Sequence, residues 1–268
     1  MSHKNGRTVQ AGFTLLELLV VLLILSVIIG AVFEQMGVAQ QRLSTEEIKL
    51  DDFQQARDFV DQFFRDINQI GTPNARMFDT TQTFTPGLAS ETNYTTYTNP
   101  PYQYIYDNRF AVGLVKIDSN EIRFEGSVNG TGTVQSVIYQ INGSGGCRYC
   151  MMRSQVDKLY NADPLGGQTP NWGTEVNDII STPIFRYFQY DGTEITTSSS
   201  PFSLPADLST PAAAQALANV KTIQINLTIR NPQVLDKQTG QPIETSFEGE
   251  ISLNNCSLAA SSQPMSCF

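Results

Sequence analysis

The sequence has few of the residues from which enzyme sites are built. Its only histidine is His3, so a chain shortened at its start would contain none. Without histidine, Ser-His and Cys-His nucleophile pairs and histidine-ligated metal sites are excluded. There is no GxxxxGK[ST] loop, and the glycine-rich stretch 143–146 lacks the strand and helix that a dinucleotide-binding loop requires. Asp51 and Asp52 fall on the polar face of a predicted helix, where solvation explains them. We therefore expect no enzyme activity, no cofactor and no metal site.

Charge is also scarce, and it is mostly negative. Charged residues make up 16% of the 268 residues, and 17 Lys and Arg against 26 Asp and Glu give a formal net charge of −9. Proteins that bind nucleic acid normally present a basic face, and no Lys/Arg cluster is visible here, so we expect no nucleic-acid partner. This length, with 40% hydrophobic residues, suits one globular domain with an attached element.

What the sequence does contain is one long apolar run near its start. Residues 1–12 are short, polar and basic, and Phe13–Phe33 then follow with a single charge, at Glu17. A helix of this length is about 31 Å long, the thickness of a hydrocarbon core. The run is too long for a cleaved secretory signal. Lys4 and Arg7 hold the N-terminal side in the cytoplasm, so we predict a single membrane span with the rest of the chain outside.

Glu17 is the informative residue of this span. A carboxylate in an apolar helix costs about 2.5–3.5 kcal/mol at the centre of a membrane and less near its surface. One explanation is its place one turn from the helix start, where the helix dipole favours an anion. Its neighbours offer another, because the run Gly12-Phe13-Thr14-Leu15-Leu16-Glu17 closely resembles the type IV prepilin (class III) signal.

This resemblance implies a maturation step and a mode of assembly. It implies that a prepilin peptidase cuts between Gly12 and Phe13 and N-methylates the new terminus, and that Glu17 pairs with the N-terminal amine of a neighbouring subunit. Cleavage would leave 15 basic against 26 acidic residues, a net charge of −11. The other implied partners are pilins or pseudopilins, bound through the N-terminal helix, and the inner-membrane assembly platform. The chain would cross the inner membrane once, with its head in the periplasm, and then enter a pilus or pseudopilus.

A helical pattern continues beyond the span. Apolar residues recur at gaps of three or four and form one stripe: Leu50, Phe53, Ala56, Val60, Phe63, Ile67 and Ile70. Gly71 followed by Pro73 is a stop signal. We therefore predict four parts. Residues 1–12 are a cytoplasmic leader that is removed, and residues 13–35 are a transmembrane and assembly helix. Residues 36–71 are an amphipathic helix that packs on the head, and residues 72–268 are a β-rich head.

Strand patterns fill the head, so the fold class we predict is α+β, with the long N-terminal helix packed on a mostly antiparallel sheet. The expected strands are Tyr102–Tyr106, Phe110–Ile117, Glu121–Glu125, Thr133–Ile141, Ile184–Tyr190, Val220–Arg230 and Thr245–Leu253. Turn signals stand at 129–132, 191–192 and 236–240. Pro211–Asn219 is predicted to be a short helix, and 72–101 a long surface loop.

The four cysteines are Cys147, Cys150, Cys256 and Cys267. A redox CxxC needs a thioredoxin-like setting, and the spacing of the last two does not form a zinc knuckle. Outside the cytoplasm disulfides are the default, with free thiols as the alternative. Three pairings are open, and we favour Cys256–Cys267, which would tether a polar tail. Cys147 and Cys150 form a second candidate pair if a turn interrupts the strand between them.

Parts of the head resemble PilW-type minor pilins, namely Gln54–Arg57, Phe64–Ile67, Asn129–Tyr139 and Phe185–Gly192. The J-type minor pseudopilins of type II secretion share much of this layout. The resemblance implies a minor pilin, a low-copy structural subunit that initiates or caps a type IV pilus. The alternatives are a minor pseudopilin of type II secretion and an adhesive tip protein whose Thr/Tyr-rich loop at 72–101 touches the target.

Overall fold

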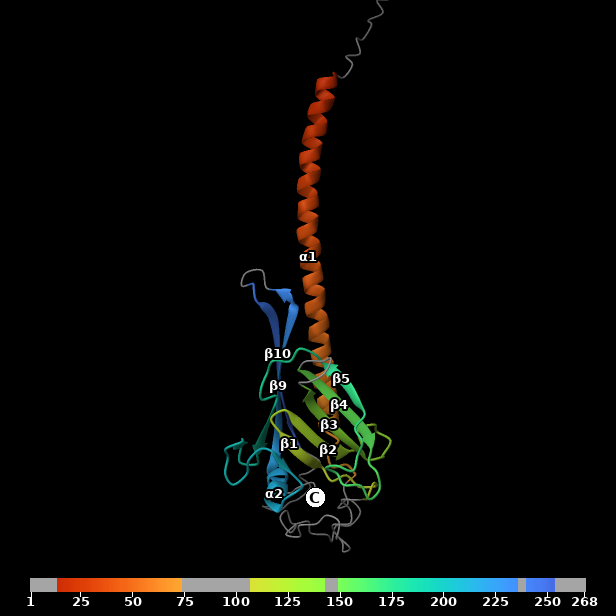
Figure 1. The fold of residues 1–268 in the computed structure, drawn as a ribbon, viewed down its shortest axis with the longest axis vertical. Helices are drawn as coiled ribbons and strands as arrows, with labels where there is room; N and C mark the ends of the chain where they lie inside the picture. The colour runs from red at the N-terminus through yellow and green to blue at the C-terminus, as the bar shows by residue number, and fades with distance from the viewer. Residues whose placement is uncertain (1–13, 74–106, 143–148, 236–239, 254–268) are drawn as a thin grey trace, which may run out of the picture. The chain divides into compact units, whose positions relative to one another are not determined.

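A computed structural model describes residues 14–73, 107–142, 149–235 and 240–253 as one long helix and a head of antiparallel strands (Figure 1). This is the predicted α+β layout. The chain divides into two compact units, Met1–Leu50 and Asp51–Phe268. The elements are α1 Leu15–Ile67, β1 Leu114–Asp118, β2 Glu121–Gly126, β3 Gln135–Asn142, β4 Cys150–Asp157, β5 Trp172–Val176, β6 Phe185–Gln189, β7 Glu194–Ile195, β8 Ala206–Asp207, α2 Pro211–Asn219, β9 Val220–Leu235 and β10 Pro242–Ser252.

The first unit, as far as it is described, is the N-terminal part of α1. Every large apolar side chain from Leu15 to Val38 is exposed. Among the described residues, α1 is the one helix long and apolar enough to cross a membrane. Exposed apolar surface of this extent is stable only in lipid or against other apolar helices.

The larger sheet of the second unit, sheet A, has the strand order β5-β4-β3-β2-β1-β8, and every neighbouring pair is antiparallel. β2 and β3 pair without a shift from Glu121↔Gln140 to Gly126↔Gln135. They are joined through the predicted turn at 129–132, where Gly130 and Gly132 have positive φ. Alternation along these strands buries Phe124 and Tyr139 in the core.

The smaller sheet, sheet B, has the order β10-β9-β6-β7. It is dominated by the β9–β10 pair, which keeps one register from Ile243↔Asn231 to Ser252↔Thr222. The odd-numbered side chains of β9 from Ile223 to Ile229 are buried in the core. The even-numbered side chains of both strands therefore lie on the opposite face of the sheet, away from the core.

Within this unit, the last turns of α1 contact both sheets. The ring centroid of Phe63 lies 5.3 Å from that of Tyr139 on β3 and 5.4 Å from that of Phe185 on β6. Ala56 and Ile67 are also buried, whereas Leu50, which the sequence places on the same stripe, is 62% exposed. The helix is thus anchored in the core by its final turns.

The structure corrects several predicted boundaries. α1 ends at Ile67 and not at residue 71, because Ile70 forms a bridge to Gly126 and the N–H of Gly71 donates to the carbonyl of Glu125. β1 begins at Leu114 and not at Phe110, since the preceding residues leave strand geometry, with Gly113 at φ 99°. The backbone groups near residues 70 and 113 instead bond to β2 and its side chains.

Other strand predictions are closer, and four strands were missed. β2, β3, β6 and β10 match the expected strands within about three residues at either end, and α2 matches its predicted range. β9 begins at Val220 as predicted but continues to Leu235, beyond the predicted end at Arg230. β4, β5 and the two-residue strands β7 and β8 were not predicted. β4 reads CMMRSQVD, without clean alternation, because its Arg153 reaches inward to an acidic partner on α1. The predicted strand Tyr102–Tyr106, the loop 72–101 apart from its first two residues, and the turn at 236–239 lie outside the described residues.

Gly126 makes the junction between α1 and sheet A possible. A Cβ atom there would lie 2.8 Å from the carbonyl carbon of Gln69 and still closer to its oxygen. We expect Gly126→Ala to destabilise the head by about 3 kcal/mol, because backbone must move to make room. Denaturant unfolding of the full chain in detergent, followed by the fluorescence of Trp172, measures this. Gly173→Ala is the control, since its Cβ would meet only an ordinary contact at 3.9 Å. Equal stability of the two variants would contradict the expectation.

Candidate functional site

The first turn of α1 contains a reciprocal hydrogen-bonded pair. Thr14 precedes the first helical residue, Leu15, and its hydroxyl accepts the N–H of Glu17 at 3.3 Å. In return, Oε2 of Glu17 accepts the N–H of Thr14 at 3.2 Å and its hydroxyl at 3.2 Å. This arrangement is a capping box, which satisfies two of the N–H groups that a helix start leaves without partners.

The capping box gives Glu17 a defined position. Its carboxylate is folded back on the N-terminal end of α1, where the partial positive charge of the helix dipole favours an anion. The sequence signal for it is the pattern S/T-x-x-E, here Thr14 to Glu17, which overlaps the prepilin-type signal. Gly12 and Phe13, the expected cleavage pair, lie outside the described residues. The structure therefore describes the acidic half of the predicted assembly site.

A comparison with protein families finds a match in the same segment of the chain. Residues 7–33 match the family model for the prokaryotic N-terminal methylation motif. The matched segment contains Gly12, Phe13 and Glu17 together with most of the exposed apolar part of α1. No curated protein and no solved structure matches the chain significantly.

The chain thus carries a prepilin-type signal, which supports a general role as a type IV pilin or pseudopilin. The motif implies cleavage by a prepilin peptidase, N-methylation and assembly with other pilins. With the apolar N-terminal helix, it fits a protein anchored in a membrane. It points to a structural subunit rather than to an enzyme.

In the head, a polar network ties α1 to sheet A. Asp66 on α1 is 1% exposed, and its Oδ2 accepts the hydroxyl of Tyr139 at 2.7 Å and Nη2 of Arg153 at 2.6 Å. Gln62, one turn earlier, donates to Oδ1 of the same carboxylate at 2.6 Å. Burial and the adjacent carboxylate hold the pKa of Tyr139 well above its usual value. Because all partners are satisfied, the network orients the helix on the sheet instead of forming a reactive centre.

A second buried pair joins β2 to the segment that follows β4. The side chains of Glu125 and Lys158 are both fully buried, with Oε2 and Nζ 2.7 Å apart. Oε2 also accepts the N–H of Val112 at 3.0 Å, and Nζ also donates to the carbonyl of Phe110 at 3.0 Å. Oε1 of Glu125 has no hydrogen-bond partner among the described residues. Burial raises the pKa of Glu125, although Lys158 opposes the shift.

Of the four cysteines, only Cys150 falls within the described residues, and it is disulfide-bonded. Its Sγ lies at the start of β4, 3.1 Å from Oδ1 of Asn177. The other three cysteines, and with them the partner of Cys150, lie outside the described residues. The pairings Cys256–Cys267 and Cys147–Cys150 therefore stay predictions.

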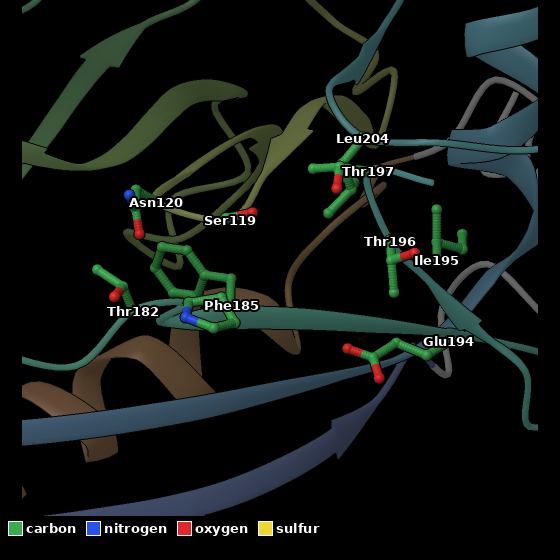
Figure 2. Close-up of a pocket in the computed structure, with 10 residues that line it drawn as sticks. Ser119, Asn120, Thr182, Phe185, Glu194, Ile195, Thr196, Thr197 and Leu204 are labelled. Atoms are coloured by element: carbon green, nitrogen blue, oxygen red, sulfur yellow. The ribbon is translucent and has the colours of Figure 1, made fainter. Parts of the chain in front are cut away.

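A depression of about 390 Å³ opens between the β1–β2 turn and the β6–β7 hairpin (Figure 2). Figure 2 shows Asn120 and Thr182 at one end of it and Glu194 and Thr196 at the other. Oδ1 of Asn120 is buried without a partner among the described residues. The Glu194 carboxylate is held by Arg186, with contacts of 2.8 and 2.6 Å. The lining thus combines hydroxyl side chains and the amide of Asn120 with apolar side chains, and its one carboxylate is already paired.

Proposed function

We propose that this chain is a minor pilin, a low-copy subunit that initiates or caps a type IV pilus. The observation that carries the proposal is the N-terminal segment. A prepilin-type motif, an exposed apolar segment of α1 and a carboxylate positioned on the first helical turn occur together. A helix of this kind must be covered by lipid or by the helices of other subunits.

The size and irregularity of the head favour low copy number over a major, fibre-forming role. The second unit runs from Asp51 to Phe268 and holds two separate sheets. A subunit packed in thousands of copies gains from a small, regular head, because each surface must fit the next copy. Resemblance of parts of the head to PilW-type minor pilins, noted from the sequence, points the same way.

A minor pseudopilin of type II secretion is the alternative, since it would use the same signal and the same helix. The carboxylate of Glu17 has the same role in either case, which is to offset the N-terminal amine of a neighbouring subunit within the apolar bundle. An adhesive tip protein is a third candidate, and its predicted contact loop lies mostly outside the described residues.

A deletion strain in the native host distinguishes these functions. We expect loss of surface pili or of twitching while exoproteins are exported normally, because a fibre without its initiating subunit does not assemble. Electron microscopy of pili and an exoprotein profile of the culture medium measure both. Normal piliation with exoproteins trapped in the periplasm would instead identify a pseudopilin, and normal piliation with reduced surface attachment would identify an adhesin.

A further inference from the structure

The outer edge of β10 is the one long free strand edge among the described residues. β10 has 11 residues and pairs on one side only, with β9. The other terminal strands of the two sheets are β5, with five residues, and β7 and β8, with two each. Long edges invite pairing with another chain, and proteins usually block them with proline, bulges or inward-pointing charges. From Ile243 to Ser252, β10 has no proline and one unbroken register, and its charges point outward.

The face of β10 toward α1 is apolar and incompletely covered. The Phe247 ring lies 5.0 Å from that of Phe53 on α1, and Phe53 remains 44% exposed. Gly249 lies directly beneath the ring of Phe64, so the helix approaches the strand closely at this point. Phe247 and Ile251 are only partly buried. A strand added beside β10 would place every second side chain against these aromatic rings.

The opposite face of β10 is acidic. Glu244, Glu248 and Glu250 are all exposed there. Glu244 is paired with Arg230 of β9, at 2.6 Å, whereas Glu248 and Glu250 form no ion pair with any described residue. Opposite charges on neighbouring strands stabilise a sheet, and like charges destabilise it. A strand beside β10 is therefore favoured if its outward side chains are Lys or Arg.

The described strands of a second copy of this chain do not fit this edge. In a β10–β10 pair the same acidic rows would lie side by side. The remaining described edges, β5, β7 and β8, contain Glu175, Glu194 and Asp207 and have no Lys or Arg. Because no described strand of a second copy is complementary, a different protein is favoured as the partner.

We propose that the free edge of β10 binds an extended segment of a different subunit, in which apolar side chains facing Phe53 and Phe247 alternate with basic side chains facing Glu248 and Glu250. The added strand continues sheet B by backbone hydrogen bonds, and the alternation supplies specificity. This proposal rests on the proposed function, because it assigns the partner to the assembly that the N-terminal helix enters.

The test uses the full chain in its native host, with a photoreactive benzoylphenylalanine at Ser246 on β10. The control carries it at Thr174 on β5, also an exposed hydroxyl residue on an edge strand. We expect Ser246 to give an adduct with another pilin-like subunit, mapped by mass spectrometry to a segment that alternates apolar and basic residues. Introducing Glu248→Lys and Glu250→Lys together should lower the adduct yield about tenfold, because two attractive cross-strand pairs become repulsive. Glu175→Lys, with the same kind of charge change on β5, should leave the yield within about twofold.

Three results would overturn the proposal: an adduct at Ser246 no stronger than at Thr174, an adduct only with a second copy of this chain, or a yield that does not respond to the charge reversals. The same cells report on the proposed function through the chain's presence in sheared fibres. If the chain enters fibres and gives no adduct at Ser246, the β10 proposal alone is wrong. If the adduct forms but the chain never enters fibres, the minor-pilin proposal alone is wrong.

Discussion

Replacing Glu17 by Val is expected to reduce incorporation of the chain into fibres by about a hundredfold or more, with membrane insertion and cleavage unchanged. In the assembled bundle an N-terminal amine would lose its counter-charge, and removing one member of a buried ion pair costs about 3–5 kcal/mol. Insertion is unaffected because Val is more favourable than Glu in lipid. Sheared fibres are compared by immunoblot, and intact mass shows whether the mature chain begins at N-methylated Phe13.

The variant Glu17→Gln distinguishes the role of the negative charge of Glu17 from the role of its capping hydrogen bond. A Gln side chain keeps an oxygen that accepts the N–H of Thr14, as Oε2 of Glu17 does at 3.2 Å, but it carries no charge. If ion pairing in the fibre is the role of Glu17, the Gln variant should assemble as poorly as the Val variant. Assembly of Glu17→Gln at the wild-type level would show that the capping box is what matters. Retention of residues 1–12 in wild-type protein from cells with a working prepilin peptidase would contradict the processing itself.

Lys158→Met is expected to destabilise the head by about 3–5 kcal/mol, because it leaves the Glu125 carboxylate buried without a counter-charge. Both side chains are fully buried, so water cannot replace the lost partner. The decrease in the free energy of unfolding caused by Lys158→Met should be smaller at pH 5 than at pH 8. Burial already raises the pKa of Glu125, and losing Lys158 raises it further. A raised carboxyl pKa makes the folded state less stable as pH rises from the unfolded value through the folded one, since the unfolded state releases its proton first.

Two variants serve as controls for this pair. Lys116→Met removes a cation from Glu121, which keeps Arg123 as a second partner, so we expect a loss below about 1 kcal/mol. The double variant Lys158→Met with Glu125→Leu removes both buried charges and should recover most of the stability, since apolar residues of similar size often replace a buried pair at little cost. Denaturant unfolding followed by Trp172 fluorescence measures all of them. A double variant as unstable as Lys158→Met would argue against an unpaired charge as the cause.

Features with a local signal could be predicted from the sequence. The prepilin-type signal occupies contiguous residues around Gly12, Phe13 and Glu17, and its family match is equally local, at residues 7–33. The start of β9 and the range of α2 were predictable because β9 alternates regularly and the segment of α2 begins with proline and is rich in alanine. The capping box also has a local signal, which is the spacing of three residues between Thr14 and Glu17.

Features that join distant segments could not be predicted in the same way. Arg153 breaks the alternation of β4 because it points inward to Asp66. This contact could not be predicted from the local sequence, since Asp66 is 87 residues away in the chain. The same holds for the pair of Glu125 and Lys158, which are 33 residues apart. A charged residue in a polar or alternating segment is predicted to face solvent unless its partner is known. The burial of these charged side chains could therefore not be predicted from the sequence.

The sequence by itself determined the N-terminal anchor, the α+β class and the acidic character of the chain, because composition, periodicity and short motifs act within a few residues. Only the tertiary structure decided where α1 stops, which carboxylates are buried and which strand is left at an edge. A strand's neighbours are set by the packing of the whole sheet, and the local pattern of β10 is the same whether one side or both are paired. That β10 pairs on one side only among the described strands, with aromatic rings on one face and glutamates on the other, therefore emerged only when the strand order was known.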